Sequence, residues 1–425
     1  MTTQVEWSPA RRIGFRFAFL VGALLIFPFP VTAIPRTDWL DSALEKPLHE
    51  AAQWLASRMF DLPAPFPGPS GSGDRAADHA QLLLIAVLAV LGTIVWSALD
   101  RRRRAYPRLA AGARVVLRYY LAAVMLSYGF SKVVKSQFYD LSPGVLHQRL
   151  GDVPPMRLLW AFMGYSLPYT VFAGLAECAG GALLLWRRTA TLGALLVAIV
   201  MTNVVLMNLS YDVPVKLFSM RLLVMAIAIA WPDARRLLGA VLGRAAAELP
   251  PRARMTPRME RGRLVAKLVL IVLMVLDVYL AYGRRPAHDD RGHELHGNWI
   301  VDSFVADGVE HPPLTTDPVR WESWSANPRS MQIWLMNGTY EGRSELPDRG
   351  WYELKVDPSA HTITVTIDRN LKTRETWTYS RPAPDRLIID GMHRGKSLHV
   401  VLHLEPEGVL MTRGFHWLND VPYNH

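Results

Sequence analysis

Seven runs of apolar residues constrain the fold of this 425-residue chain more than any other feature. A helix of about 20 apolar residues crosses the hydrocarbon core of a lipid bilayer. The runs are 13–34, 80–99, 114–134, 168–186, 190–209, 217–232 and 264–282, and the sixth is the shortest. The sequence therefore predicts an α-helical polytopic membrane bundle of about seven spans.

Arginine clusters at the ends of these runs predict which side of the membrane each loop occupies. The clusters are Arg11, Arg12 and Arg16 at the start of the first run, 101–104 after the second, Arg187 and Arg188 after the fourth, and 233–263 between the sixth and seventh. All four places fall on one side if seven runs span the bilayer, and cytoplasmic loops are rich in lysine and arginine. We therefore expect a cytoplasmic amino terminus, with everything after residue 283 outside the cytoplasm.

The first run also allows a second interpretation. Its basic start, apolar centre and small Ala33 are typical of a secretory signal peptide that is removed by cleavage. Because the second run would still begin outside the cytoplasm, this alternative leaves the remaining topology unchanged.

Two connecting segments differ in composition from the apolar runs. Residues 61–78 are rich in proline, glycine and serine, which predicts an extracytoplasmic linker. Residues 233–263 form a basic cytoplasmic loop, and the stretch 232–249 within this region has helical spacing. This stretch is either a helix held on the inner leaflet by anionic lipid or a solvated connector.

Short β-branched and aromatic runs replace the long apolar runs from about residue 294. The eight expected strands are 297–305, 330–342, 352–357, 362–369, 375–380, 386–395, 397–405 and 409–417. Turn residues divide them and no helical run intervenes, which predicts an antiparallel β-barrel or sandwich. We expect a folded extracytoplasmic β-domain, tethered by the last span.

These patterns divide the chain into five segments. They are two N-terminal spans with their linker (1–112), a four-helix membrane bundle (113–232), the basic loop (233–263), the last span (264–283) and the β-domain (284–425).

Glu177 lies near the middle of the fourth run, with no basic residue within one helical turn. A carboxyl group at the bilayer midplane is energetically costly and usually has a function. Polar residues are also expected in the outer halves of the third and fifth runs and beyond the fifth; they are Tyr128, Lys132, Asn203, Asn208, Asp212, Lys216 and Arg221. We predict that these residues and Glu177 form a ligand-binding or proton site in the bundle, open toward the outside.

Three partners are available to Glu177 under this hypothesis: the hydroxyl of Tyr128, the amide of Asn203 and the ammonium of Lys132. Small residues around Glu177 allow a neighbouring helix to approach closely; they are Ala173, Ala176, Gly180 and Gly181. The alternative is that the polar groups only hold the helices together. Asp212 and Lys216 also fit an ordinary salt bridge in a loop.

Several classes of function are excluded by composition. Cys178 is the only cysteine, so the chain has no internal disulfide, paired redox thiols or multi-cysteine metal centre. The net charge of +10 comes from arginines at the ends of apolar runs, and no nucleic-acid recognition motif accompanies it. We therefore expect the lipid bilayer to be a partner, and not nucleic acid.

His399 and His403 lie on one face of a predicted strand, opposite the face of its apolar residues. A metal site there would need a third ligand such as His393. Two surface histidines are our preferred interpretation, so we predict no metal site.

Two stretches of the third and fourth runs resemble the DoxX-like family of bacterial membrane proteins. They are "RYYLAAVMLSYGFSKVVKSQF" and "FAGLAECAGGALLLWRRTATLGALL", followed by a helix with a polar end, and the resemblance covers about 113–232. It implies a four-helix bundle in the bacterial inner membrane, with Glu177, Tyr128 and Lys132 lining a quinone or lipid pocket. The family's name-giving member is a subunit of a thiosulfate–quinone oxidoreductase. The additional spans and the β-domain depart from the minimal family.

The β-domain is similar to the lipocalin-type pattern in "HGNWIVDSF" near its start and "MTRGFHW" near its end. The resemblance implies that Trp299 opens the first strand and that Arg413, in the last strand, packs across it through a cation–π contact. Both residues would be structural. Such a barrel either holds one small apolar ligand or has a packed interior.

Three hypotheses follow for the function. The first is a membrane protein, not catalytic alone, that binds a quinone, lipid or other amphiphile in the bundle and uses the tethered β-domain to bind a ligand or a cell-envelope partner. The second is a subunit of a quinone-linked oxidoreductase, for which quinone is the cofactor and a redox partner is required. The third is a proton-coupled small-molecule transporter in which Glu177 is the protonation site.

Overall fold

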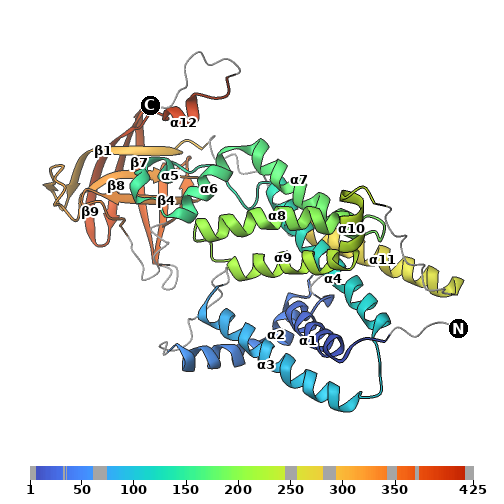
Figure 1. The fold of residues 1–425 in the computed structure, drawn as a ribbon. Helices are drawn as coiled ribbons and strands as arrows, with labels where there is room; N and C mark the ends of the chain where they lie inside the picture. Colours follow the sequence, from blue (N-terminus) through green and yellow to red (C-terminus); the bar gives the residue numbers. More distant parts are fainter. Residues whose placement is uncertain are drawn as a thin grey trace. The chain divides into compact units, whose positions relative to one another are not determined.

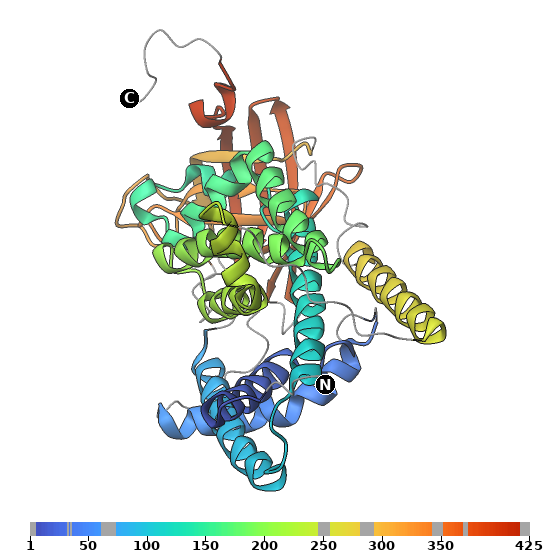
Figure 2. The same ribbon diagram turned by 45° about the vertical axis from the view of Figure 1, so that its right-hand side comes forward.

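The computed structural model describes residues 6–31, 34, 36–60, 74–244, 256–280, 293–341, 352–368 and 373–416. The chain forms two compact units, one of residues 1–139 and 154–287 and one of residues 140–153 and 288–425 (Figures 1 and 2). Most of the predicted linker (61–73), part of the basic loop (245–255) and residues 281–292 lie outside the described residues.

The first unit is helical. Its longer helices are α1 (Pro9–Ile26), α2 (Asp38–Met59), α3 (Ala76–Leu99), α4 (Pro107–Val133), α6 (Pro155–Tyr165), α7 (Leu167–Leu184), α8 (Ala190–Ser210), α9 (Lys216–Ala230) and α11 (Pro257–Val278), with the short α10 (Ala234–Val241) after α9. Within the described chain, five stretches are long and apolar enough to cross a membrane; they are Ala76–Leu99, Pro107–Val133, Leu167–Leu184, Ala190–Ser210 and Lys216–Val241. The helices expected from the second to the sixth run are therefore confirmed. Spanning by α1 and α11 stays a prediction, and α2 was not predicted.

The outward faces of these helices are apolar and are left uncovered by the rest of the described chain. Side chains such as Ile94 of α3, Ile199 of α8 and Val224 of α9 are 60%, 70% and 64% exposed. The inner faces form one cluster that includes Leu121, Leu184 and Ile229. An apolar surface of this kind is stable in hydrocarbon and not in water.

Helix α7 packs against α4 on one side and α8 on another. Glycine makes the first contact possible: a Cβ atom on Gly129 would lie 2.6 Å from the carbonyl oxygen of Gly174. The two backbones therefore touch without intervening side chains, as small residues permit in membrane helix pairs.

The second unit is a closed antiparallel β-barrel (Figure 1). Its eight main strands are β1 (Gly297–Ala306), β3 (Trp321–Ala326), β4 (Ser330–Leu335), β5 (Tyr352–Asp357), β6 (Thr362–Asp368), β7 (Thr373–Ala383), β8 (Arg386–His393) and β9 (Lys396–Leu404). Each pairs with the next, β9 pairs back to β1, and the two-residue β2 (Val309–Glu310) extends β1 as a hairpin. The prediction of an antiparallel β-domain is confirmed.

Aromatic side chains fill the barrel interior. Trp299, Trp321, Trp324 and Trp377 are each at most 1% exposed and belong to one core with Phe304 and the inward aliphatic residues. An eight-stranded barrel is just wide enough for side chains to fill. Of the two alternatives for the interior, the structure shows the packed one.

Strand β3 was missed because both of its faces are buried. The alternating pattern of a half-exposed strand is lost when a second layer covers the outer face. Helix α5 (Pro143–His147), which belongs to the barrel unit, supplies that layer over β1 and β3. Asn298 joins these parts: its oxygen accepts from Ser325 Oγ (2.6 Å), and its amide lies 2.8 Å from His147 Nδ1.

The strand predicted at 409–417 is wrong. Val409–Thr412 form the short helix α12, and Arg413 follows as its C-cap. Strand β9 already closes the barrel by pairing Leu404 with Trp299. Pro406, two residues after Leu404, has no N–H to donate and disfavours continued pairing.

Candidate functional site

Lys132 and Glu177 form a buried ion pair in the first unit. Lys132 lies in the last turn of α4 and Glu177 in the middle of α7. The Nζ atom donates a hydrogen bond to Oε2 of Glu177 at 2.8 Å, and the two side chains are only 9% and 4% exposed. Of the three partners available to Glu177, the structure shows the ammonium.

The sequence brings these side chains together through helical spacing. Gly129 lies three residues before Lys132, and Gly174 lies three residues before Glu177, so each glycine shares a helix face with its charged residue. The glycines hold the two backbones in direct contact. A lysine and a glutamate placed one turn away then meet across the same interface.

Aromatic rings lie beside the ammonium group. The Nζ atom of Lys132 is 5.8 Å from the ring centre of Tyr128 and 6.0 Å from that of Phe138. Both distances are within the range of cation–π attraction. The site thus combines a cation, an anion and two aromatic faces, a set that suits a polar group carried on a flat or apolar body.

The other polar residues predicted for this site have different partners. Asn208 donates to Ser219 Oγ at 3.0 Å in a buried contact between α8 and α9. Asp212 and Lys216 form a 2.7 Å ion pair. Arg221 lies 4.8 Å from the ring centre of Phe218, and Asn203 is exposed. The structure therefore unites Glu177, Lys132 and Tyr128 and distributes the remaining residues along α8, α9 and the loop between them.

Asp74 makes a contact that sequence analysis did not find. Its carboxylate accepts from the backbone N–H groups of Lys216 (2.6 Å) and Leu217 (2.9 Å), which are unpaired donors in the first turn of α9. The partners are more than 140 residues apart in sequence. No local pattern indicates such a cap, because Asp74 lies in the proline- and glycine-rich segment predicted as a linker.

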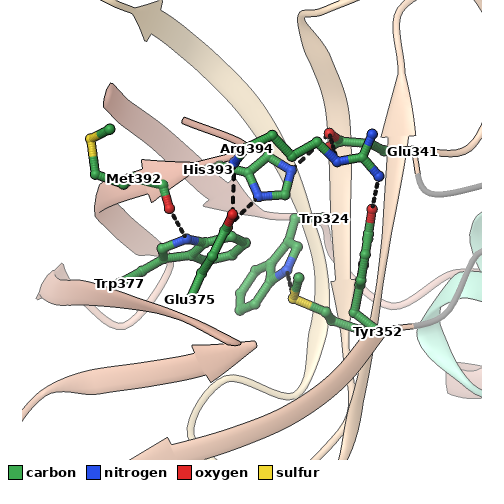
Figure 3. A network of polar contacts seen from close by, with 9 residues as sticks. Trp324, Glu341, Tyr352, Glu375, Trp377, Met392, His393 and Arg394 are labelled. Atoms are coloured by element: carbon green, nitrogen blue, oxygen red, sulfur yellow. Dashed lines mark hydrogen bonds and ion pairs between the residues drawn. The ribbon is translucent and has the colours of Figure 1, made fainter. Parts of the chain in front are cut away.

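A second polar cluster lies in the barrel, around His393 (Figure 3). The imidazole is 5% exposed, with Nδ1 2.7 Å from Glu375 and Nε2 2.7 Å from Glu341. Glu375 also accepts from the backbone N–H of Arg394 at 2.7 Å. The indole rings of Trp321 and Trp377 make T-shaped contacts with the imidazole of His393, with distances of 5.7 and 5.4 Å between ring centres.

Two carboxylates facing one imidazole favour its cationic form. Neutral histidine has a single N–H donor, whereas both nitrogens of His393 face acceptors. Burial alone lowers the pKa of His393, but the hydrogen bonds and negative charges of Glu341 and Glu375 outweigh it and raise the pKa overall. Burial, reinforced by the charge of Glu341, raises the pKa of neighbouring Tyr352 to about 12.

The three histidines considered as metal ligands do not converge. His399 is exposed and His403 half-buried; they contact Asp390 (2.6 Å) and Asp302 (2.7 Å), whereas His393 points into the interior. In the part of the chain that the structure describes, no group of three or more histidine, cysteine, aspartate or glutamate side chains is arranged to hold a metal ion.

The predicted pairing of Trp299 with Arg413 needs correction. Arg381 of β7 lies over the Trp299 ring, with its Cζ atom 5.5 Å from the ring centre, and donates to the carbonyl of Glu294 at 2.6 Å. Arg413 is not in a strand, because the chain turns into α12 after β9. Position 381 faces inward, since it follows Glu375, Trp377 and Tyr379 at the two-residue period of the strand.

Comparison with known proteins gives one informative relative. No family model matches the chain, and no solved structure matches it. The uncharacterized protein YwoB of Bacillus subtilis (strain 168) is 35% identical over 122 residues, which are 29% of this chain and 77% of YwoB. The chain belongs to the YwoB family. The name YwoB states no activity.

Proposed function

We propose that the helical unit of this YwoB-family chain binds the polar end of an amphiphile, a quinone or a lipid, at the Lys132–Glu177 pair. The buried pair is the observation that carries the proposal. An ammonium has three donors, and one is directed to Glu177, so others can serve a ligand carbonyl or phosphate. The rings of Tyr128 and Phe138 offer contact to the body of the same ligand.

A contribution to folding stability does not by itself explain the presence of a buried ion pair. Replacing a buried ion pair with apolar residues of similar volume is often neutral or stabilising. Interhelical hydrogen bonds in a membrane contribute only about 0.6 kcal/mol on average. An ion pair in an apolar bundle is therefore better explained by an interaction with a ligand than by its contribution to folding.

The proposal includes a topology. Seven spans, with α1 and α11 among them, would place the amino terminus in the cytoplasm and the barrel in the periplasm of a bacterial inner-membrane protein. The similarity to DoxX-like bundles and to lipocalin-type barrels belongs to the same proposal. Because tryptophans fill the barrel interior, we assign the barrel a surface-binding role toward a cell-envelope partner.

Proton-coupled transport is the second candidate. Its support is that Glu177 is paired with a cation: protonation of the carboxylate would leave the Lys132 ammonium without its counter-charge. Such a change in a buried pair would favour another arrangement of α4 and α7. In this case Glu177→Gln would abolish proton-dependent uptake while leaving the chain folded.

Photo-crosslinking tests the binding proposal. The purified protein is irradiated with an azido-quinone or a diazirine-bearing phospholipid, and the labelled peptides are mapped by mass spectrometry. We expect labelling around Tyr128 and Phe138, and its loss in a Lys132→Met/Glu177→Met double variant. An Asp212→Asn/Lys216→Gln variant, which removes an ion pair that includes the exposed Asp212, serves as the control. Labelling spread along the exposed faces of α3 and α8 in every version would refute the proposal.

A further inference from the structure

We propose that the loop between α3 and α4, together with the start of α1, forms a binding site for the phosphate of an anionic phospholipid. The site is separate from the Lys132–Glu177 pair and does not depend on the proposed function. It rests on a cavity, on the charge of the residues around it and on the rigidity of the loop that carries them.

The cavity is open to the surface, has a volume of about 460 Å³ and is lined by Glu6, Trp7, Arg12, Arg101, Arg102 and Arg104. Four guanidinium groups thus face one carboxylate. Glu6 forms an ion pair with Arg104. Glu6 therefore does not neutralise the positive charges of Arg12, Arg101 and Arg102. Guanidinium groups bind phosphate oxygens with several N–H donors at once.

Two of these arginines are held at the cavity by backbone contacts. Arg12 donates to the carbonyl of Arg103 at 3.1 Å, and Arg101 donates through Nε to the carbonyl of Ala98 at 3.1 Å. Each contact uses one of the five N–H donors of a guanidinium group. The remaining donors are available to an anion.

A buried hydrogen-bond network fixes the loop between α3 and α4. Arg16, only 4% exposed, donates to Tyr106 Oη (3.0 Å), Ser97 Oγ (2.7 Å) and the carbonyl of Asp100 (2.9 Å). Tyr106 in turn donates to the Asp100 carboxylate at 3.0 Å. Both ends of the loop are therefore tied to α1, and the arginines between them project from an ordered support.

Aromatic rings complete this support. Tyr106 packs with Trp7, Phe15 and Trp96 at ring-centre distances of 6.2, 5.5 and 5.5 Å. The backbone N–H of Trp7 donates to the carbonyl of Arg104 at 3.1 Å, which ties the chain before α1 to the loop. If these arginines served only to orient the spans in the membrane, their charge would be sufficient. The ordered hydrogen bonds and aromatic contacts around them would not be needed.

The position of the cavity favours a lipid over a free anion. It begins directly after α3, whose last residues Ile94, Val95 and Leu99 are 60%, 57% and 83% exposed. This helix is one of the five candidate spans, so its end lies at the level of lipid headgroups. A phosphate in the cavity would therefore place acyl chains along α3. Tryptophan beside arginine is typical of this interface.

Native mass spectrometry of the full-length protein from mixed phosphatidylglycerol and phosphatidylcholine nanodiscs tests the site. We expect the wild type to retain phosphatidylglycerol selectively, and Arg101→Gln/Arg102→Gln to weaken retention about tenfold or more, since each arginine at an anionic surface contributes about 1 kcal/mol. Arg187→Gln/Arg188→Gln, in the turn after α7, is the matched control and should bind as the wild type does. Arg103, Arg104 and Arg108 remain to preserve the charge bias.

Two further arms keep the test decisive. Arg101→Lys/Arg102→Lys keeps the charge and loses bidentate geometry, so we expect an intermediate loss even if the glutamine variant does not fold. Glycerol 3-phosphate, added at millimolar concentration without lipid, should not raise the unfolding temperature as phosphatidylglycerol does. Equal retention of both lipids, equal losses in the control variant, or full protection by glycerol 3-phosphate would each overturn the proposal.

Discussion

The Nζ atom of Lys132 lies 2.8 Å from Oε2 of Glu177, and both side chains are more than 90% buried between two helices whose backbones touch at Gly129 and Gly174. A lone charge at this place would have neither water nor a counter-ion. Each residue therefore makes the other tolerable, and the pair behaves as one unit in folding and in any binding that uses it.

Single and double substitutions of the pair should differ in the size of their effect on the unfolding free energy. Glu177→Gln leaves the ammonium of Lys132 without its counter-charge, so we expect a loss of unfolding free energy of about 3 kcal/mol. The double variant Lys132→Met/Glu177→Met removes both charges and should unfold within about 1 kcal/mol of the wild type. Denaturant titration in detergent, followed by circular dichroism, measures both. A double variant as unstable as the single one would show that the pair stabilises the fold itself.

The glycine contact gives a second prediction. Gly129→Ala would place a Cβ atom 2.6 Å from the carbonyl oxygen of Gly174, so α4 and α7 must separate, at a cost of about 1–3 kcal/mol. Gly112→Ala is the control on the same helix, because a Cβ atom there meets nothing within 4 Å. Thermal unfolding in detergent should show a lower midpoint for the first variant only. Equal midpoints would mean that the helices are not in direct contact.

Barrel stability should depend on pH through His393. Its pKa is raised above the ordinary value of about 6.5, so the contribution of the cation is complete below pH 6.5 and is lost as pH rises through the folded-state pKa. In that window the unfolding free energy should fall by up to about 1.4 kcal/mol per pH unit. Urea unfolding followed by tryptophan fluorescence measures the slope.

The matched variants for this prediction are His393→Gln and His399→Gln. The first should remove the pH dependence above 6.5, because glutamine does not titrate, and the second should retain it. If the slope is the same in all three proteins, the contacts of His393 with Glu341 and Glu375 do not determine it.

The correction at Trp299 predicts which arginine stabilises the barrel. Arg381→Ala removes the cation over the indole and the hydrogen bond to Glu294, so we expect a loss of about 1–3 kcal/mol. Arg413→Ala, beyond the last strand, should cost less than about 1 kcal/mol. Urea titration of each variant tests this order. A larger effect at position 413 would restore the arrangement implied by the lipocalin-type pattern.

Periodicity and run length predicted the elements whose pattern of burial is the same from one end to the other. Apolar runs marked α3, α4, α7, α8 and α9, but not the short α5 and α6 (Pro155–Tyr165), and alternating residues marked β1, β5 and β6. Helix α2 escaped because "DWLDSALEKPLHEAAQWLASRM" is mixed in polarity and contains Pro47. Strand β3 escaped because α5 covers its outer face.

The residues of the candidate site could be predicted only from their depth in the membrane, which was estimated from their position along each helix. Depth placed Lys132 and Tyr128 in the outer half of the bundle and Glu177 near the midplane, but it could not give the rotation of α8, which leaves Asn203 exposed. Contacts between distant segments, such as those of Asp74 with α9 or Glu341 with His393, leave no periodic signal in the sequence. The two-residue period of β7 did carry the information that Arg381 faces inward with Trp377.

Native mass spectrometry of the gently solubilised protein, with an absorption spectrum of the same sample, tests the central claim most directly. The wild type and the Lys132→Met/Glu177→Met variant are compared at equal folded fraction. The proposed function predicts a quinone or lipid retained by the wild type and absent from the variant. Equal ligand content in both proteins, or none in either, would contradict binding at the pair.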